Sequence, residues 1–339
     1  MSLHIPMRLS ISLPLPRAPL AALVLALAAV APSAGAQNRD RNRDRDRDRD
    51  RDRGDRATYR IDTTVTVGRD ATVDLGLISG DVIVTASNRD EVRVRASSEE
   101  IPLRFEHIGN SVRVSTVSGQ YRRSGDQRME VVVPIGSRVH ASSVSGDVDV
   151  RGVRGELEAT AVSGDVTVED VTRRATLRTV SGDLTARRID GDVRARSVSG
   201  DIHLERVDGE LDAESTSGEV ELVDARSSNV HAESISGRLT YDGTITRDGR
   251  YDFSSHSGTV RLVVPTDAAL SLSVSSFSGT VNSELPATLA PTSRDGNGRG
   301  PSRRRMDLTI NGGGARVTAQ TFSGNIVIER AGSSRKNRE

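Results

Sequence analysis

The sequence contains no cysteine and no tryptophan, and aromatic residues make up only 2% of it. Without cysteine the chain forms no disulfide, carries out no thiol chemistry and offers no N-terminal cysteine for lipid attachment. The scarcity of aromatic rings argues against the ring-lined clefts of many enzymes and sugar-binding sites. Basic and acidic residues balance at 47 each, so the basic excess that is typical of nucleic-acid-binding proteins is missing.

Residues 1–36 have the pattern of an export signal. Arg8 and Arg17 supply positive charge, an apolar core runs from Leu20 to Val30, and a small-residue cleavage site ends at Ala36. The core is shorter than the about 20 residues that a membrane-spanning helix needs, and no later stretch qualifies. We therefore predict an exported protein without a transmembrane segment, located in the periplasm, at the cell surface or outside the cell.

The composition suggests further divisions along the chain. Residues 37–57 are rich in Arg and Asp and have almost nothing apolar to bury, which predicts a disordered linker. Residues 58–140 contain irregularly spaced strand patterns, either looser coils or an antiparallel cap over the repeats that follow. Residues 141–330 carry a Ser-Gly-Asp repeat with a Pro- and Gly-rich loop insertion at 286–305, and 331–339 form a basic tail.

A nine-residue phrase is repeated nine times between Gly146 and Arg226. The residue before the phrase alternates, so that serine returns every eighteen residues, as expected for a coil with two unlike corners. We predict that the Ser-Gly pairs form one of these corners. The predicted corner residues are Ser145, Gly146, Ser163, Gly164, Ser181, Gly182, Ser199, Gly200, Ser217, Gly218, Ser236 and Gly237.

Hydrophobic residues within each phrase predict strands. The third and fifth residues, such as Val148 and Val150, share one face of a strand, and the third apolar residue, such as Val153, follows a shift of parity that requires a bend. Successive coils would stack as parallel strands about 4.8 Å apart. The predicted fold is all-β, a parallel β-solenoid (two-layered β-helix) of 18-residue coils made of two nine-residue half-repeats, with a less regular β N-terminal part. An antiparallel meander is the alternative.

Charged residues at fixed places in the phrase support the parallel stack. Arg151, Glu169, Arg187 and Glu205 alternate in sign from coil to coil and would become neighbours. The acids after the coil-start glycines would form a ladder, and we expect each to cap its own turn through backbone N–H groups. Calcium binding is the alternative, although the calcium-binding nonapeptide has a second glycine that these phrases lack. The acids of this ladder are Asp147, Asp165, Asp183, Asp201 and Glu219.

The period loosens after Arg226, where Ser-Gly pairs recur at 236, 257, 278 and 323. The residue before the serine enlarges from valine to phenylalanine at Phe277 and Phe322, and we expect these rings to plug the final coils. A Val-Val-Pro segment ends at Pro134 and again at Pro265. The chain therefore uses the same entry strand twice.

Several of these segments together resemble a known family. The segment VVVPIG at 131–136, the VSGDV-type turns that begin at 144–148, and TFSGNIVI at 321–328 are similar to the DUF4097 family of bacterial β-strand-repeat proteins, which are labelled adhesins. The resemblance covers about residues 58–330. It implies an all-β envelope or surface protein and transfers no catalytic residue.

No pattern in the sequence indicates catalysis. Neither H-E-x-x-H nor G-x-S-x-G occurs, and the histidines are scattered singly, so His203 and His231 are interpreted as outward strand residues. We predict a non-enzyme without catalytic residues, cofactor or metal site, which presents a flat polar surface for multivalent binding to a surface polymer or an envelope protein. The alternatives are a self-associating envelope scaffold and a polysaccharide-degrading β-helix enzyme.

Overall fold

The computed structural model describes residues 58–117, 125–289 and 304–332. The predicted signal segment 1–36 and linker 37–57 lie outside the described residues, as do 290–303 of the loop insertion and 333–339 of the tail. Every regular element in the described ranges is a β-strand. No helix there is long and apolar enough to span a membrane.

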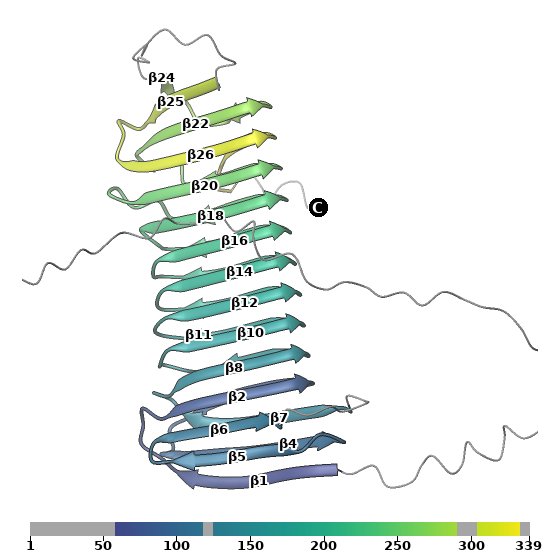
Figure 1. Cartoon of the computed structure of the whole chain (residues 1–339). Coiled ribbons are helices and arrows are strands. Elements are labelled where there is room, and N and C mark those ends of the chain that lie inside the picture. Colours follow the sequence, from purple (N-terminus) through teal and green to yellow (C-terminus); the bar gives the residue numbers. More distant parts are fainter. Residues whose placement is uncertain (1–57, 118–124, 290–303, 333–339) are drawn as a thin grey trace, which may run out of the picture. The chain divides into compact units, whose positions relative to one another are not determined.

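The strands form two large sheets, which we call sheet A, with 13 strands, and sheet B, with 14 (Figure 1). In chain order they are β1 (Thr58–Thr66), β2 (Thr72–Ser79), β3 (Asp81–Ser87), β4 (Glu91–Glu99), β5 (Leu103–Ile108), β6 (Ser111–Thr116), β7 (Gln127–Pro134), β8 (Arg138–Ser145), β9 (Val148–Arg151), β10 (Leu157–Ser163), β11 (Val166–Val171), β12 (Ala175–Ser181), β13 (Leu184–Ile189), β14 (Val193–Ser199), β15 (Ile202–Val207), β16 (Leu211–Ser217), β17 (Val220–Ala225), β18 (Asn229–Ser236), β19 (Leu239–Gly243), β20 (Arg250–Ser257), β21 (Val260–Val264), β22 (Leu270–Ser278), β23 (Val281–Ser283), β24 (Thr288–Leu289), β25 (Arg304–Ile310), β26 (Ala315–Ser323) and β27 (Ile326–Arg330).

The middle of the protein is the predicted parallel solenoid. From β8 to β21 successive strands alternate between the sheets, and each strand pairs in parallel with the strand one coil later. Leu157 is in register with Ala175, and Ala175 with Val193, which is a step of eighteen residues each time. This register confirms the eighteen-residue coil and excludes the antiparallel meander for these strands.

The core is a thin layer of aliphatic side chains between the two sheets. Val166 and Val168 of β11 are fully buried, and so is Val171 at its end. The predicted shift of parity occurs at Asp170, whose φ of 58° places it in the left-handed region. The same conformation recurs at Arg188 and Arg206 in the next two coils, so one repeated bend turns the third apolar residue of alternate phrases inward.

At the N-terminal end, the coils are not stacked in the order in which they occur along the chain. The coil β2–β3 pairs directly with β8 and β9, and Val73 is in register with Val139, 66 residues later. The coil β6–β7 lies on the other side of β2–β3, and β1, β4 and β5 then add antiparallel pairs. Residues 58–134 therefore combine coils with an antiparallel cap, both of which the irregular strand patterns suggested.

The C-terminal end is also out of order. The last coil of the chain, β26–β27, is inserted between the coil β20–β21 and the coil β22–β23, and yellow β26 lies between two green strands in Figure 1. Tyr251 of β20 is in register with Val317 of β26, again 66 residues later. The antiparallel strands β25 and β24 follow β22 at the outer edge of sheet B.

Both departures follow a Val-Val-Pro segment. After β7, which ends at Pro134, the chain passes the level of β2–β3 before it forms β8. After β21, Pro265 begins a passage across the level that β26–β27 occupies. The two passages open with the same turn, in which the N–H of Ser137 or Ala268 donates to the proline carbonyl, at 3.0 and 3.1 Å. The duplicated segment thus marks a step of two levels in the stack.

The expectation that Phe277 and Phe322 plug the final coils is wrong. Both rings are 45% exposed, because each side chain points outward at the end of its strand. The core at this end is enlarged instead by the buried rings of Tyr241, Tyr251 and Phe253. Tyr241 contacts the other two rings at centroid distances of 5.8 and 5.2 Å.

Candidate functional site: the outer faces and corners of the solenoid

The Ser-Gly pairs lie at the corner where each strand of sheet B ends. Each serine is the last residue of its strand and is exposed, and each glycine forms the bend that follows. The glycines of the Ser-Gly pairs from Gly146 to Gly237 have φ between 146° and 157°, which only glycine adopts readily. A Cβ atom on Gly182 would also overlap the carbonyl oxygen of Gly164 in the preceding coil. The close approach of adjacent coils therefore requires glycine here.

The acids after these glycines bind the next coil and not their own turn. The Asp147 carboxylate accepts the backbone N–H of Asp165 at 2.8 Å, and the Asp165 carboxylate accepts that of Asp183 at the same distance. The pattern continues to Glu219, whose N–H donates to Asp201 at 2.7 Å. The expectation that each acid caps its own turn is therefore corrected, because the donor comes from the coil eighteen residues later. In each of these aspartates one carboxylate oxygen is therefore used to join adjacent coils.

Hydroxyl groups also join adjacent coils at this corner, but they belong to the residue two places before the Ser-Gly serine. Ser143 donates to the carbonyl of Gly80 at 2.9 Å, and Thr179 donates to that of Gly164 at 3.2 Å. Both side chains are buried. This role was not predicted, although the Ser or Thr at this position in most coils was the available signal.

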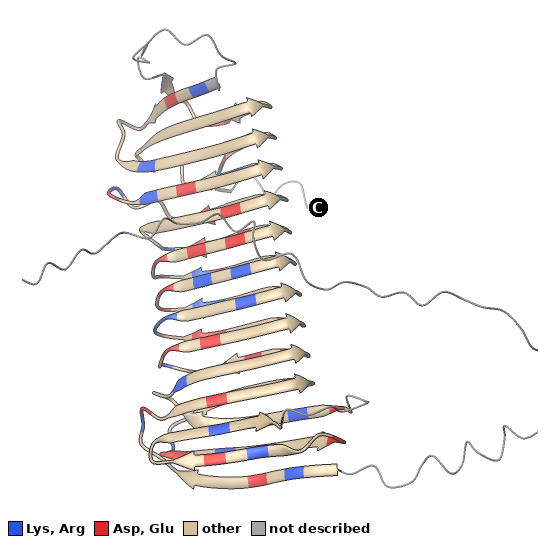
Figure 2. Cartoon of the chain, in the orientation of Figure 1, with Lys and Arg blue, Asp and Glu red and all other residues tan. Residues whose placement is uncertain are grey.

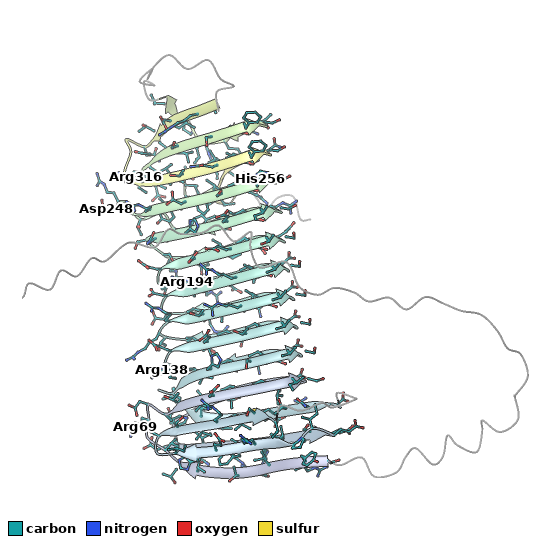
Figure 3. The ribbon with its side chains drawn as sticks, in the orientation of Figure 1. Arg69, Arg138, Arg194, Asp248, His256 and Arg316 are labelled. Carbon is teal, nitrogen blue, oxygen red and sulfur yellow. The ribbon has the colours of Figure 1, made fainter. Side chains whose placement is uncertain are left out.

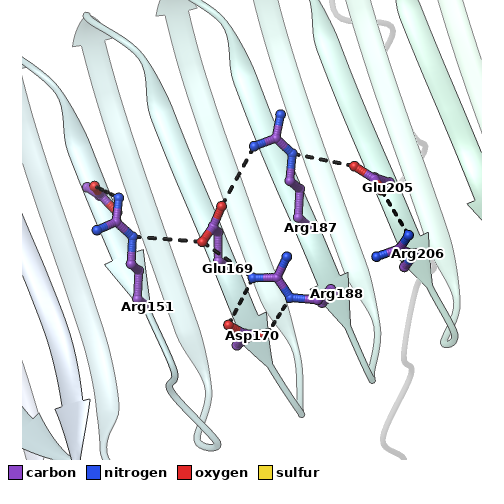
Figure 4. Close-up of polar contacts among 8 residues, drawn as sticks. Arg151, Glu169, Asp170, Arg187, Arg188, Glu205 and Arg206 are labelled. Carbon is purple, nitrogen blue, oxygen red and sulfur yellow. Dashed lines mark hydrogen bonds and ion pairs between the residues drawn. The ribbon is translucent and has the colours of Figure 1, made fainter.

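The outer face of sheet A carries the predicted ladder of alternating charge (Figure 4). Glu169 forms ion pairs with Arg151 at 3.9 Å and with Arg187 at 3.7 Å, and Arg187 also reaches Glu205 at 3.5 Å. The register pairs of β9, β11, β13 and β15 place these residues side by side. The prediction is confirmed.

Arg188 extends this ladder to the second corner. Its guanidinium binds both oxygens of Asp170, at 2.7 and 3.0 Å, and this hydrogen-bonded pair lowers the pKa of Asp170 below its ordinary value. Asp149 behaves differently, because burial raises its pKa although Arg151 donates to it at 2.6 Å. Every side chain in this ladder thus has a charged neighbour within the sheet.

The outer face of sheet B has two charged rows in its middle strands. Arg194 binds Asp212 at 3.0 Å and Arg196 binds Glu214 at 3.0 Å, each pair joining β14 to β16. Asp212, Glu214 and His231 are the one group in the described residues with three metal-ligating atoms within 4.8 Å of one another. Because both carboxylates already face arginines, the group is better suited to a charge network than to a cation.

Two further histidines lie in the same kind of pairing. His140 contacts Glu158 at 3.3 Å and His203 contacts Glu221 at 3.0 Å, in each case across one step between coils. His203 and His231 are outward residues of β15 and β18, as interpreted from the sequence. Residues eighteen or nineteen positions apart lie side by side in adjacent coils, so each of these histidines meets a carboxylate of the neighbouring coil. Short sequence motifs could not reveal such contacts.

The outer face of sheet B changes character near its C-terminal end. Figure 2 shows charged bands on the strands from β8 to β20, whereas β22 has none. Ser271, Ser273 and Ser275 line the outer face of β22, and longer side chains of β25 and β26 stand on both sides of them. The result is a hollow of about 550 Å³, which we call the serine trough. Its lining residues are Ser271, Leu272, Ser273, Ser275, Arg305, Asp307, Leu308, Thr309, Arg316, Thr318 and Gln320.

The serine trough was not predicted, because it depends on the insertion of β26. Its floor comes from β22 and its walls from β25 and β26, and β26 lies between β22 and β20 although it follows both of them along the chain. Arg250 of β20 and Arg316 of β26 are in register beside it. No acid of the described residues forms an ion pair with either arginine, so two like charges stand together at this edge.

A family model described as Toastrack DUF4097 matches residues 121–329, more than half of the chain. A solved structure of a "putative adhesin" from Parabacteroides distasonis is 10% identical, with a TM-score of 0.42, and the match covers 82% of this chain and 98% of that chain. A "putative adhesin" from Bacteroides fragilis is 13% identical, with a TM-score of 0.40, and covers 79% and 96% respectively. No curated protein matches the sequence. Function must be inferred from the surfaces of the chain itself.

Proposed function

The chain belongs to the Toastrack DUF4097 family, and we propose that it is an exported, non-catalytic protein. We propose further that it binds an anionic polymer of the cell envelope through the outer face of sheet B. The observation that carries this proposal is the serine trough with Arg250 and Arg316 beside it. Hydroxyl groups and guanidinium groups together are suited to a saccharide that carries carboxylates.

The charged rows on the middle strands support repeated, weak contacts. Exposed ion pairs such as Arg194 with Asp212 contribute only about 0–1 kcal/mol each. Their arginines can therefore exchange a neighbouring carboxylate for one of a ligand at little cost. A polymer lying along the stack would meet such groups on successive coils about 4.8 Å apart, and many weak contacts would add to a useful avidity.

The binding proposal is tested with polygalacturonate as the anionic probe and dextran as the neutral one. We expect the full chain, immobilised on a biosensor, to bind polygalacturonate more tightly than dextran, with affinity that increases with polymer length and decreases with salt. Equal binding of the two polymers would contradict the proposal.

A pair of matched variants locates the site. We expect Arg316→Gln to weaken polygalacturonate binding several-fold, because it removes one of the two adjacent arginines. Arg138→Gln is the control, since Arg138 has the same position in β8 but is paired with Glu156 at 3.0 Å. Ser273→Val, which reduces the depth of the trough without changing charge, should also weaken binding. A similar loss in Arg138→Gln would show that the trough has no special role.

Two further measurements test the other parts of the proposal. The polymer should keep its length after incubation with the protein, and shortening would indicate the polysaccharide-degrading alternative. The protein recovered from cell fractions should begin at Gln37 and should be found in the envelope or the medium. Retention of residues 1–36 on a cytoplasmic protein would contradict export.

A further inference from the structure

The exposed large hydrophobic side chains are concentrated in one row. Six of the eight in the described residues occupy the position directly before a Ser-Gly pair, with exposed fractions from 41% to 47%. They are Val144, Val162, Val180, Ile235, Phe277 and Phe322. The register of the following serines places this row along one margin of sheet B. We call it the apolar stripe, which in spatial order comprises Val144, Val162, Val180, Val198, Thr216, Ile235, His256, Phe322 and Phe277.

The C-terminal end of the apolar stripe is aromatic. The rings of His256 and Phe322 are stacked with centroids 4.9 Å apart, and Phe322 is stacked on Phe277 at the same distance. Figure 3 shows His256 at the C-terminal ends of the strands, opposite Arg138 and Arg316. A hollow of about 330 Å³ lies beside these rings. A row of exposed apolar side chains of this kind marks an interaction site.

The two rows that flank the apolar stripe have complementary charges. The first flank is the row of residues two positions before the stripe in each coil, and its charges along the stack are positive, positive, negative and negative. The second flank is the row three positions after the stripe, and its charges at the same levels are negative, negative, negative and positive. The first flank comprises Arg178, Arg196, Glu214 and Glu233, and the second comprises Asp183, Asp201, Glu219 and Arg238. Three of the four levels therefore have opposite charges on their two flanks.

We propose that the apolar stripe binds a second copy of this chain, with the two stripes parallel and related by a twofold axis along their length. In that arrangement the first flank of one copy faces the second flank of the other, so Arg178 faces Asp183 and Glu233 faces Arg238. Only the level of Glu214 and Glu219 has like charges. With antiparallel stripes, each flank would face itself in reverse order, so the first flank would be complementary and Asp201 and Glu219 of the second flank would meet. The parallel arrangement differs in placing the aromatic ends of the two stripes together.

The spacing of the side chains in the apolar stripe and the area of the stripe are also suited to a second copy of the chain. A stripe that repeats once per coil matches the spacing of another such stripe, so that the valines of the two copies meet at every level. A band about 38 Å long and about 16 Å wide covers on the order of 600 Å² per copy, at the lower limit of specific interfaces, which bury about 1,200 Å² in total. The dimer is therefore weak and depends on concentration.

Sedimentation equilibrium of the full chain tests the interface. We expect a concentration-dependent dimer whose dissociation constant increases at least tenfold in the double variant Val162→Thr and Val180→Thr, because threonine keeps the strand shape but adds a polar group. Ile108→Thr is the matched control, since Ile108 is 78% exposed on β5, outside the stripe. A protein that stays monomeric at every concentration, or an equal loss in the control, would overturn the proposal.

Cysteine substitutions test the orientation, because the chain has no cysteine of its own. Val144→Cys and Phe277→Cys lie at opposite ends of the stripe. With parallel stripes, each variant should form disulfide-linked dimers with itself on oxidation. If only the mixture of the two variants cross-links, the stripes are antiparallel and the charge pairing is wrong. Binding of monomers to vesicles of neutral phospholipid, without dimers in solution, would identify the stripe as a lipid contact and overturn the proposal.

Discussion

The middle coils and the two ends of this solenoid are built from strands of the same kind, but the order of the coils in the stack follows the order of the sequence only in the middle. In the middle, each residue pairs with the one eighteen positions later, so neighbours in space are neighbours along the chain. At both ends the partners are 66 residues apart. A regular stack of coils could lose its terminal coils one at a time, whereas an inserted coil is held on both sides.

The ends of the stack, unlike its middle, must protect the open edges of the two sheets. An open edge of a parallel sheet exposes unpaired backbone N–H and C=O groups. Here antiparallel strands follow the outer coils, β4 and β1 in sheet A and β5 in sheet B at one end, and β25 and β24 in sheet B at the other, where sheet A ends on the short strand β23. The out-of-order coils link these caps to the regular repeats. The ends therefore have many contacts between distant parts of the sequence, while the middle has mainly local ones.

Removing coils gives the largest expected effect. Deleting residues 315–332 removes β26 and β27 and uncovers both neighbouring coils, so we expect the free energy of unfolding to decrease on the order of 5–10 kcal/mol, at about 1.5–3 kcal/mol per buried Val or Ile. Deleting 164–181 removes one complete coil of the middle and joins Ser163 to Gly182 in register, so the loss should be much smaller. Urea unfolding measures both, and equal losses would refute the distinction between ends and middle.

A single corner glycine comes next. We expect Gly182→Ala to decrease the free energy of unfolding by about 2–3 kcal/mol, because alanine resists a φ of 149° and its Cβ overlaps the coil before it. Gly76→Ala, within β2, is the control, where the nearest atom to a new Cβ is the Ser142 hydroxyl at 3.4 Å. If both variants have the same stability, close approach at the corner is not what requires glycine.

The acid ladder gives a smaller effect. We expect Asp165→Ala to cost about 1 kcal/mol, because the N–H of Asp183 loses its acceptor. Asp165→Asn keeps an oxygen at the same place and should cost less, which thermal unfolding of the two variants can compare. A stabilising effect of calcium on the wild type, lost in Asp165→Ala, would contradict the assignment of these acids to backbone N–H groups.

The smallest effect concerns Asp170 at the second corner. Its pKa is lowered by Arg188 from the ordinary 3.8, so the pair contributes stability above the unfolded-state pKa and loses it as the pH falls through the lowered folded-state value. We expect Asp170→Asn to be less stable than the wild type at neutral pH and equal to it in strong acid. A difference that stays constant across this pH range would show that the ion pair is not responsible.

Much of the middle could be predicted from the sequence because the repeat makes distant contacts local. The return of serine every eighteen residues predicted the register, and the sign alternation from Arg151 to Glu205 predicted the ion pairs. The acid ladder that begins at Asp147 was predicted, but the hydrogen-bond donors to its carboxylates were not, because an aspartate can accept a backbone N–H of its own turn or of the next coil equally well. Phe277 and Phe322 were misplaced, since a large apolar residue usually indicates a core position.

The amino-acid sequence alone specifies the all-β class, the length of the coil, the corners that require glycine and the faces of the regular strands. The positions of the coils at the two ends depend on tertiary packing, and the serine trough and the aromatic end of the apolar stripe depend on those positions. The physical reason is that side-chain alternation and repeat length specify how a strand meets an identical neighbour. Where the repeat is interrupted, several coils present equally suitable edges, and packing of the whole core selects between them.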